Sequence, residues 1–335
     1  MDQSDRPTVV TVANEAGVSI ASVSRVLNGL PASPAMAARV MEASERLGYV
    51  PDATARSLKA RRTSQLAFAV PDISNPVYVE MMRSIETATK SSGFRLLIHS
   101  TGADSADELD LVKSLRHRYV DGLVVTSLRM SPPLLDALRK TAVPVVVIGN
   151  VPDDFPIDSV RTSSKRAAHL AVKHLVESGR RAIGFINGPQ DTAPGRGRRE
   201  GYEEALAAEG LPFKESFVAL GSDFTHQAGH EAARQLLQKV RPDAVFCAND
   251  LIALGALRAF REAGTNVPAD ISVVGLDDTE LAAMSTPSLS SVSLRSGERG
   301  RLAAQLLLKR LAQPGMPPLR YEVEPSLVVR ESSSR

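Results

Sequence analysis

The sequence predicts an α/β protein with two lobes, each built on a doubly wound parallel sheet, preceded by a small all-α unit. From about Gln65 onward, short β-branched runs alternate with helical stretches, a pattern typical of parallel strands joined by crossover helices. The first 62 residues have no strand pattern and contain three helical stretches. Because about 270 residues of α/β pattern exceed what one open sheet comfortably holds, we expect two lobes.

Seven apolar runs mark the expected strands. They are near-continuous rather than alternating, as expected when helices cover both faces of a parallel sheet. The runs are QLAFAVP (65–71), FRLLIH (94–99), DGLVVTS (121–127), VPVVVIG (143–149), RAIGFIN (181–187), DAVFCAN (243–249) and ISVVGLD (271–277).

The expected domain boundaries follow from these patterns. The small unit spans residues 1–62, with a hinge helix at about 52–60, and the α/β domain spans 63–335. We assign about 63–162 and 293–321 to the first lobe, and about 163–292 and 322–330 to the second. Two segments are candidate crossings between the lobes, the polar Asp158 to Ser164 and the serine-rich Pro287 to Leu294, although either is compatible with an ordinary loop.

Composition excludes several classes of protein. No apolar run approaches the roughly 18 residues that a membrane span needs. The N-terminal stretch MDQSDRPTVV carries acids where a signal peptide has a basic region, and Cys247 is the single cysteine, so no intramolecular disulfide forms. We therefore expect a cytoplasmic protein.

The net charge of +2 is concentrated at the N-terminus. Residues 1–62 hold eight Lys/Arg and six Asp/Glu, which leaves 32 of each for the remainder. Arg56, Lys59, Arg61 and Arg62 fall within seven residues that contain no acid. A local positive charge of this kind attracts a polyanion.

The segment Ser19 to Asn28 predicts an amphipathic helix capped by Ser19. At 100° per residue, one arc holds Val23, Val26 and Leu27, which can pack on the preceding helix through Val12, Ala13 and Ala16. The opposite arc holds Ile20, Ala21, Ser24, Arg25 and Asn28. Two helices joined by a glycine-containing turn indicate a helix-turn-helix whose second helix enters the major groove of DNA, and the alternative is a solvated helix face.

Motifs along the whole chain resemble one family of proteins. TVANEAGVSIASVSRVLNG (11–29) and ERLGYVPDATARSL (45–58) resemble the headpiece and hinge of the lac-repressor and galactose-repressor family of bacterial transcription regulators. The resemblance continues through PDISNP (71–76), VDGLVV (120–125), NGP (187–189), RREGYEEAL (198–206), ANDLIALGAL (248–257) and ISVVGLDDTELA (271–282). It implies a periplasmic-binding-protein-like effector domain behind the helix-turn-helix headpiece.

The resemblance also implies which residues contact DNA. Ile20, Ala21 and Arg25 match the base-reading positions, and Arg25 can donate two hydrogen bonds to guanine while the apolar pair contacts thymine methyls. Leu58 matches the hinge leucine that is wedged between base steps in the minor groove, and Arg56 lies beside it. The positions expected to support these contacts or touch the DNA backbone are Ser19, Ser22, Ser24 and Asn28.

Three positions depart from the family pattern in this region. Met36 and Ala37 stand where the family usually has Thr and Arg, so a phosphate contact and a charged group are expected to be missing. Asp52 replaces the usual Asn, and its charge opposes binding to phosphates although it caps a helix equally well.

Polar side chains follow most of the expected strands, where a parallel sheet places its ligand. By resemblance to the family, Arg198, Asn249 and Asp277 hold polar groups of an effector, and Tyr78 and Phe224 place flat rings against it. Asp72 and Asn150 also follow expected strands. Carboxylate, guanidinium and amide groups around aromatic rings are typical of sugar or nucleoside recognition. For Asp250 and Asp278 we favour helix N-capping over ligand contact.

Other residues near this site leave the effector unnamed. Arg196, Arg198 and Arg199 would favour a carboxylate or phosphate on the ligand, although at least one of them is expected to face solvent. Departures from the family pattern occur at Ser163, Ser164 and Gly149, where ligand-binding side chains are common.

Enzymatic and transport functions are the alternatives. GRGRREG (195–201) matches neither the dinucleotide fingerprint nor a phosphate-binding P-loop. His226 and His230 lack the partners of a zinc site, and Cys247 is expected in the core, so we expect no metal, cofactor or catalytic residue. A transport-type sugar-binding protein would share the two-lobed fold but needs a signal peptide and no DNA-reading unit.

The sequence therefore predicts a ligand-responsive repressor that binds a palindromic operator as a homodimer. Two headpieces must reach two half-sites, so a monomer would bind poorly. The chain ends after SLVVRESSSR without a leucine heptad, so no tetramerising coiled coil is expected. Whether the effector, such as a sugar, releases DNA or tightens binding stays open.

Overall fold

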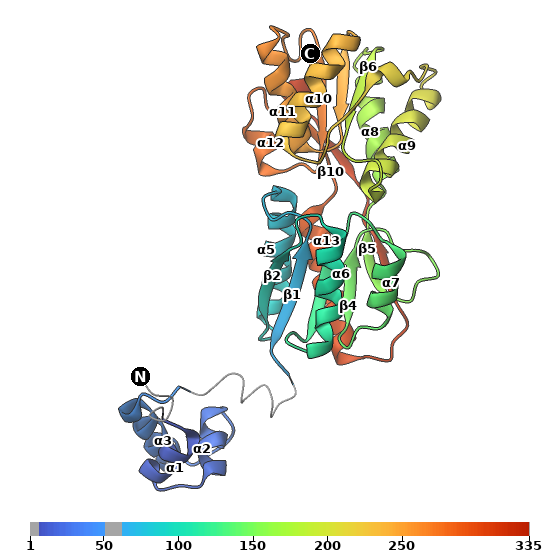
Figure 1. The fold of residues 1–335 in the computed structure, drawn as a ribbon. Coiled ribbons are helices and arrows are strands. Elements are labelled where there is room, and N and C mark those ends of the chain that lie inside the picture. The colour runs from blue at the N-terminus through green and yellow to red at the C-terminus, as the bar shows by residue number, and fades with distance from the viewer. Residues whose placement is uncertain (1–6, 51–61, 335) are drawn as a thin grey trace. The chain divides into compact units, whose positions relative to one another are not determined.

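The computed structural model describes residues 7–50 and 62–334, and the chain divides into two compact units, Met1–Thr63 and Ser64–Arg335 (Figure 1). The expected hinge helix at 52–60, with Asp52, Arg56 and Leu58, lies outside the described residues. Among the helices that are described, none has the length and apolar character needed to cross a membrane.

The N-terminal unit contains three helices, α1 (Val9–Ala16), α2 (Ile20–Leu27) and α3 (Pro34–Leu47). The turn between α1 and α2 needs Gly17, whose φ of 60° lies in the left-handed region that favours glycine. Ser19 caps α2 as expected, because its side chain accepts a hydrogen bond from the backbone of Ser22.

The apolar arc of α2 faces the core of this unit, as its periodicity predicts. The buried residues of this core are Val12, Ala13, Ala16, Val23, Val40 and Ala43, and Val26 and Leu27 pack against them. The helix-turn-helix is thus held together by one apolar face of each helix, and the opposite face of α2 is left to solvent.

The first lobe of the second unit is built on a six-stranded parallel sheet in the order β11-β5-β4-β3-β1-β2. Its strands are β1 (Gln65–Val70), β2 (Arg95–Ser100), β3 (Gly122–Thr126), β4 (Val145–Ile148), β5 (Asp158–Arg161) and β11 (Arg320–Glu322). Its helices are α5 (Pro76–Lys90), α6 (Ser105–Ser114), α7 (Pro132–Arg139) and α13 (Ser296–Ala312), with the 3₁₀ helix η2 (Leu115–His117).

The second lobe contains another six-stranded sheet, in the order β12-β10-β9-β8-β6-β7. Its strands are β6 (Ile183–Asn187), β7 (Val218–Leu220), β8 (Ala244–Cys247), β9 (Ser272–Leu276), β10 (Ser290–Ser293) and β12 (Ser326–Val328), the last antiparallel to β10. Its helices are α8 (Ser164–Glu177), α9 (Ala193–Ala208), α10 (His226–Lys239), α11 (Asp250–Glu262) and α12 (Glu280–Met284), with η3 (Glu215–Phe217) and η4 (Glu331–Ser333).

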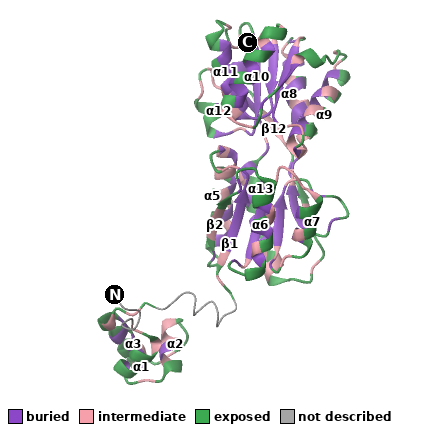
Figure 2. Ribbon diagram, in the orientation of Figure 1, coloured by how far each residue is buried: buried purple, intermediate pink, exposed green. Residues whose placement is uncertain are grey.

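Helices cover both faces of each sheet, which explains the near-continuous apolar strands. In β1, Leu66, Phe68 and Val70 pack with α5 and α13, whereas the intervening Ala67 and Ala69 pack with α6 and α7. Figure 2 shows the buried residues gathered on the strands of both lobes. The predicted fold class is confirmed.

The chain crosses between the lobes three times, in segments that join strands or helices of different sheets. These are residues 162–163 after β5, 294–295 after β10, and 323–325 between β11 and β12. Two of the expected lobe boundaries, at 292/293 and 321/322, lie one residue before the position in the structure. Ser293 still pairs with Ser326 in the second sheet, and Glu322 still pairs with Arg161 in the first, because the strand ladders continue to these residues.

Candidate functional site

The outer face of α2 presents a short, mostly apolar and cationic surface. Ile20, Ala21 and Arg25 are exposed, and Ile20 retains 49% of its accessible surface. The Arg25 guanidinium donates through Nη1 to the Pro31 carbonyl at 3.4 Å, which leaves its other N–H groups free for a base edge.

The remaining polar residues of α2 mostly organise one another. The Ser19 and Ser22 hydroxyls lie 2.9 Å apart at the N-terminus of the helix. At the other end, Asn28 Nδ2 donates to the carbonyl of Ser24 at 2.7 Å and to its hydroxyl at 3.3 Å. These bonds pre-order the helix ends around the exposed trio Ile20, Ala21 and Arg25.

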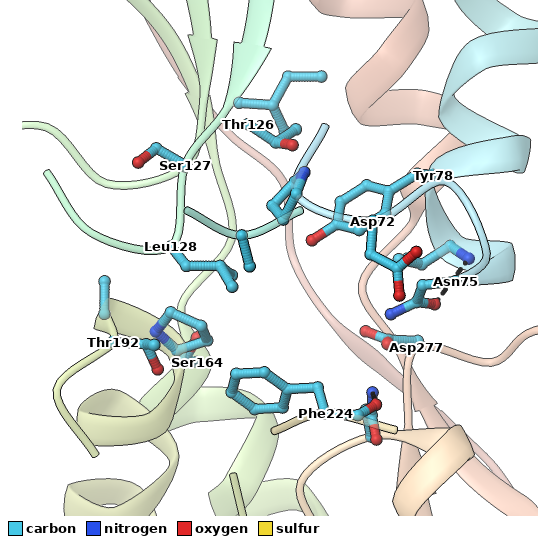
Figure 3. A pocket seen from close by; sticks show the side chains of 18 of the residues that line it. Asp72, Asn75, Tyr78, Thr126, Ser127, Leu128, Ser164, Thr192, Phe224 and Asp277 are labelled. Carbon is cyan, nitrogen blue, oxygen red and sulfur yellow. Dashed lines mark hydrogen bonds between the residues drawn. The ribbon is translucent and has the colours of Figure 1, made fainter. Parts of the chain in front are cut away.

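A cavity of about 570 Å³ lies at the carboxyl ends of strands from both lobes. All seven residues predicted from the sequence line it. Asp72, Tyr78 and Asn150 come from the first lobe, and Arg198, Phe224, Asn249 and Asp277 come from the second. Figure 3 shows Tyr78 above the space and Phe224 below it, with Asp72 and Asp277 both drawn at its right. A ligand here would therefore contact both lobes at once.

Asp277 is positioned by an unusual turn at the end of β9. Its φ of 113° and that of Asp278, 55°, both lie in the region that favours glycine, so the surrounding structure holds the turn against local strain. Asp277 is 6% exposed, and burial raises the pKa of its carboxyl to about 6 although Arg198 and Arg299 oppose the shift. Within the described chain, no side chain donates a hydrogen bond to this carboxylate.

Phe224 forms an aromatic wall of the cavity. The guanidinium carbon of Arg198 lies 5.5 Å from the ring centroid, a cation–π contact. Gly188 makes room for this ring, because a Cβ atom at that position would lie 2.4 Å from Phe224 Cε1. The ring's position thus depends on a glycine in the loop after β6.

Asn249 is placed as expected, but most of its hydrogen-bonding capacity is used within the protein. Its Oδ1 accepts from the Ile252 backbone at 2.8 Å, which caps α11, and its Nδ2 donates to the Phe224 carbonyl at 3.0 Å. One amide hydrogen remains for a ligand. Asn249 therefore holds Phe224 in place as well as lining the cavity.

The expected N-capping by Asp250 and Asp278 is wrong. Asp250 is 1% exposed and accepts from the Thr279 backbone and hydroxyl and from the Ser291 hydroxyl, tying α11 to β10. Asp278 forms an ion pair with Arg330 at 2.7 Å. Asn249 caps α11 instead, because it and not Asp250 precedes the first helical residue.

The arginines of the α9 region separate into different roles. Of Arg196, Arg198 and Arg199, Arg198 lines the cavity, whereas Arg196 is exposed and Arg199 pairs with Glu203 and Glu215. Nearby, Ser164 and Gly149 line the cavity and Ser163 caps α8. His230 binds Glu262 at 2.8 Å, which is a contact between α10 and α11.

Sequence reasoning missed Arg299 and a polar patch from the loop after β3. Arg299 lies on α13, is 8% exposed and lines the cavity. Its signal was available, since it shares the buried face of the helix with Gly300, Ala303 and Leu307. Ser127 and Arg129 also line the cavity, and Ser127 donates at 3.0 Å to the buried carboxylate of Glu108.

Two family profiles match the chain. The profile described as "Bacterial regulatory proteins, lacI family" matches residues 8–52, and that described as "Periplasmic binding protein-like domain" matches residues 172–333. The HTH-type transcriptional regulator CelR of Thermobifida fusca is 37% identical over 342 residues, covering 99% of this chain and 100% of CelR. The chain belongs to the lacI family of bacterial regulatory proteins.

Another curated relative and two solved structures of known regulators resemble this lacI-family protein along nearly its whole length. The ribose operon repressor of Escherichia coli (strain K12) is 35% identical over 329 residues, which cover 97% of this chain and 99% of the repressor. The structure of the transcriptional regulator CelR–cellobiose complex matches with a TM-score of 0.75 and 36% identity, covering 98% and 100% of the two chains. The lac repressor dimer bound to operator and the anti-inducer ONPF matches with a TM-score of 0.85 and 27% identity, covering 98% and 99%.

This lacI-family protein is therefore a DNA-binding transcriptional regulator. The relatives that cover its full length are regulators and repressors, not enzymes, so the enzymatic alternative is set aside. The lacI-type match at residues 8–52 likewise sets aside a transport-type binding protein.

Proposed function

We propose that this lacI-family protein is a cytoplasmic repressor whose operator binding is switched by a small polar effector held between its two lobes. The observation that carries the proposal is the cavity of about 570 Å³, which is lined by buried charged side chains and by aromatic rings, with each lobe contributing both. A ligand that contacts both lobes favours one angle between them. The difference between the ligand's affinities for the two lobe arrangements determines how far binding shifts the protein from one arrangement to the other.

The α2 surface is the base-reading element in this proposal. Arg25 leaves the Pro31 carbonyl and donates to guanine O6 and N7, while Ile20 and Ala21 contact thymine methyls. The supporting residues are Ser19, Ser22, Ser24 and Asn28; Leu58 of the hinge segment enters the minor groove, and Arg56 also contacts DNA.

The effector is proposed to be sugar-like. Asp277 and Arg198 offer a carboxylate and a guanidinium for hydroxyl groups, Phe224 and Tyr78 offer flat faces, and Asp72, Asn150 and Asn249 complete the site. Relatives are consistent with this class: one solved relative is a cellobiose complex, and another relative is a ribose operon repressor.

The DNA-bound form is proposed to be a homodimer on a palindromic site. One α2 reads one half-site, so two-fold symmetric DNA requires two copies of the chain. The lac repressor structure with matching fold is a dimer bound to operator.

Selection of bound sequences from random DNA, followed by titration of the selected site, tests this function. We expect a near-palindromic site whose binding weakens steeply as salt rises, because bound counterions are released from phosphates. Scrambling one half-site should remove most of the affinity. Salt-independent binding, or equal affinity for the scrambled site, would contradict the proposal.

A further inference from the structure

Two arginines from opposite lobes lie buried at the same cavity. Arg198 on α9 belongs to the second lobe, and Arg299 on α13 belongs to the first. They are 7% and 8% exposed, and both line the cavity. Burying an arginine is costly unless its charge is paired and its N–H groups are bonded.

Neither guanidinium has the hydrogen-bond and ion-pair partners that would offset the cost of its burial. Arg299 donates one hydrogen bond, from Nη2 to the Ser296 hydroxyl at 3.1 Å, and Arg198 donates none to a described residue. The Nε atoms of both are buried without a partner. A guanidinium has five N–H donors, so nearly all the donors of this pair are unused.

The nearby acids do not complete the pair. Asp277 lies close enough to influence both arginines, yet among the described residues no ion pair joins it to either. Glu80 is exposed and accepts from the Gly297 backbone at 3.1 Å. Asp72 accepts from the backbone and hydroxyl of Ser74, both at 2.8 Å. None of these three carboxylates therefore accepts a hydrogen bond from Arg198 or Arg299.

Electrostatics agrees with this geometry. Burial lowers the pKa of the Arg299 guanidinium to about 10, and the positive charge of Arg198 lowers it further, while Asp277, Tyr78 and Glu80 oppose the change. Burial also lowers the pKa of Arg198. Arginine stays protonated at neutral pH, so two like charges from opposite lobes line one cavity, and no carboxylate of the described residues forms an ion pair with either.

We propose that the effector carries an anionic oxygen group, a carboxylate or a phosphate, that binds between Arg198 and Arg299. This inference rests on the proposed function, because it concerns the ligand of the same cavity. Guanidinium groups donate paired hydrogen bonds to such anions with favourable geometry. The hydroxyl-bearing part of the ligand then lies toward Asp277 and Phe224, so the effector is an acidic or phosphorylated sugar-like molecule.

The anion also explains how the ligand acts on the lobes. The two guanidinium charges repel each other across the lobe boundary. An anion between them attracts both, so its binding draws Arg198 and Arg299 together. The ligand's affinity therefore differs between lobe arrangements, which is the condition for shifting their populations.

The test is thermal unfolding of the full chain with inorganic phosphate or acetate, at constant ionic strength set with chloride. Arg299→Met removes the charge at similar volume. Arg301→Met is the matched control, because Arg301 lies on the same helix, is exposed and contacts Gln305 at 3.0 Å. We expect phosphate or acetate to raise the unfolding temperature of wild type and Arg301→Met by several degrees more than that of Arg299→Met. The more effective anion distinguishes a phosphate site from a carboxylate site.

Without added anion, Arg299→Met should unfold at the same or a higher temperature than wild type, since an unpaired buried charge is removed. Arg198→Met should lose the anion response in the same way, and Arg299→Lys should keep part of it. Equal stabilisation of all variants, or strong destabilisation of Arg299→Met without anion, would overturn the proposal. The second result would make Arg299 a structural partner of Asp277.

Operator titration separates this inference from the proposed function. Arg299→Met should still prefer the symmetric operator over the scrambled site in the absence of ligand, since Arg299 belongs to the unit that lacks the DNA-reading helix. Failure of wild type to bind symmetric DNA would refute the proposed function and leave the anion result standing. A neutral effector whose affinity is unchanged in Arg299→Met would refute the anion site alone.

Discussion

Arg129 and Asp191 join the two lobes by a two-point ion pair, with Nε 2.7 Å from Oδ2 and Nη2 3.2 Å from Oδ1. Arg129 follows β3 in the first lobe, and Asp191 follows β6 in the second. Beside this pair, the Ala193 backbone donates to the Leu128 carbonyl at 2.8 Å. These contacts lie beside the cavity and connect the two lobes, so a motion that separates the lobes must break them.

Asp191→Asn should loosen this contact between the lobes. The two side chains are 30% and 65% exposed, so we expect an effect of about 0–1 kcal/mol rather than unfolding. Hydrogen exchange at the Ala193 amide should become a few-fold faster, while β1 amides are unchanged. Asp136→Asn, which removes a surface pair with Lys140, is the control. Unchanged exchange at Ala193 would show that the ion pair does not hold the lobes.

Arg25→Ala should weaken operator binding by about 1–3 kcal/mol and relax the preference at one guanine in each half-site, because a bidentate base contact is lost. Ile20→Ala should alter the preference at a thymine with a smaller loss. Binding titrations against single-base variants of the selected site measure both effects. A uniform loss across all sequences would instead identify Arg25 as a phosphate contact.

Glu108→Gln should change how stability depends on pH. Burial raises the pKa of Glu108 to about 7 from its usual 4.5, although the hydrogen bond from Ser127 opposes the shift. Between these values the folded protein binds a proton that the unfolded chain has released, so stability falls as pH rises through this window. Glutamine cannot ionise. Relative to wild type, the variant should gain on the order of 2 kcal/mol between about pH 5 and pH 8.

Urea unfolding across this pH range measures the difference, with Glu86→Gln, an exposed position on α5, as the control. A constant difference between wild type and Glu108→Gln would mean that Glu108 keeps the same charge throughout the range. The cavity would then have a fixed carboxylate behind Ser127.

Gly188→Ala should weaken effector binding and spare operator binding. The added Cβ atom would lie 2.4 Å from Phe224 Cε1, so the ring must move away from Arg198 and the cavity. We expect about two- to tenfold lower ligand affinity by calorimetric titration, since an aromatic contact is worth about 0.5–1.5 kcal/mol. Gly315→Ala, where no atom lies within 4 Å of the added Cβ, should bind as wild type does. Normal affinity in Gly188→Ala would remove Phe224 from the ligand site.

The sequence predicted the seven strands with near-continuous apolar runs but not the other five strands of the described chain. β5 reads DSVR and β10 reads SSVS, so neither carries a strand pattern. Their pairing depends on distant partners. Asp158 of β5 is 3% exposed because Arg310 of α13 pairs with it at 2.9 Å. Such contacts between residues far apart in sequence are invisible to local periodicity.

Sequence patterns also predicted only part of the effector site. Asp277 directly follows β9, so topology alone predicts that it faces the cavity, whereas Arg198 lies within α9 and was expected at the site by resemblance to the family. Arg299 stands in SGERGRLAAQ among several other charges; helical periodicity places it on the buried face of α13, but only the packing of the lobes shows that this position reaches the cavity. The bonds of Asn249 with Ile252 and Phe224 depend on loop conformation, which no spacing rule predicts.

The most direct test of the central claim is the thermodynamic coupling between effector and operator. Operator affinity is measured with and without the ligand found by thermal-shift screening, and ligand affinity is measured with and without operator. The same factor should appear in both titrations, typically about 5- to 150-fold, because linkage is reciprocal. Asp277→Ala should bind operator normally and lose the coupling. Equal ligand affinity with and without operator, or full coupling in Asp277→Ala, would contradict the account.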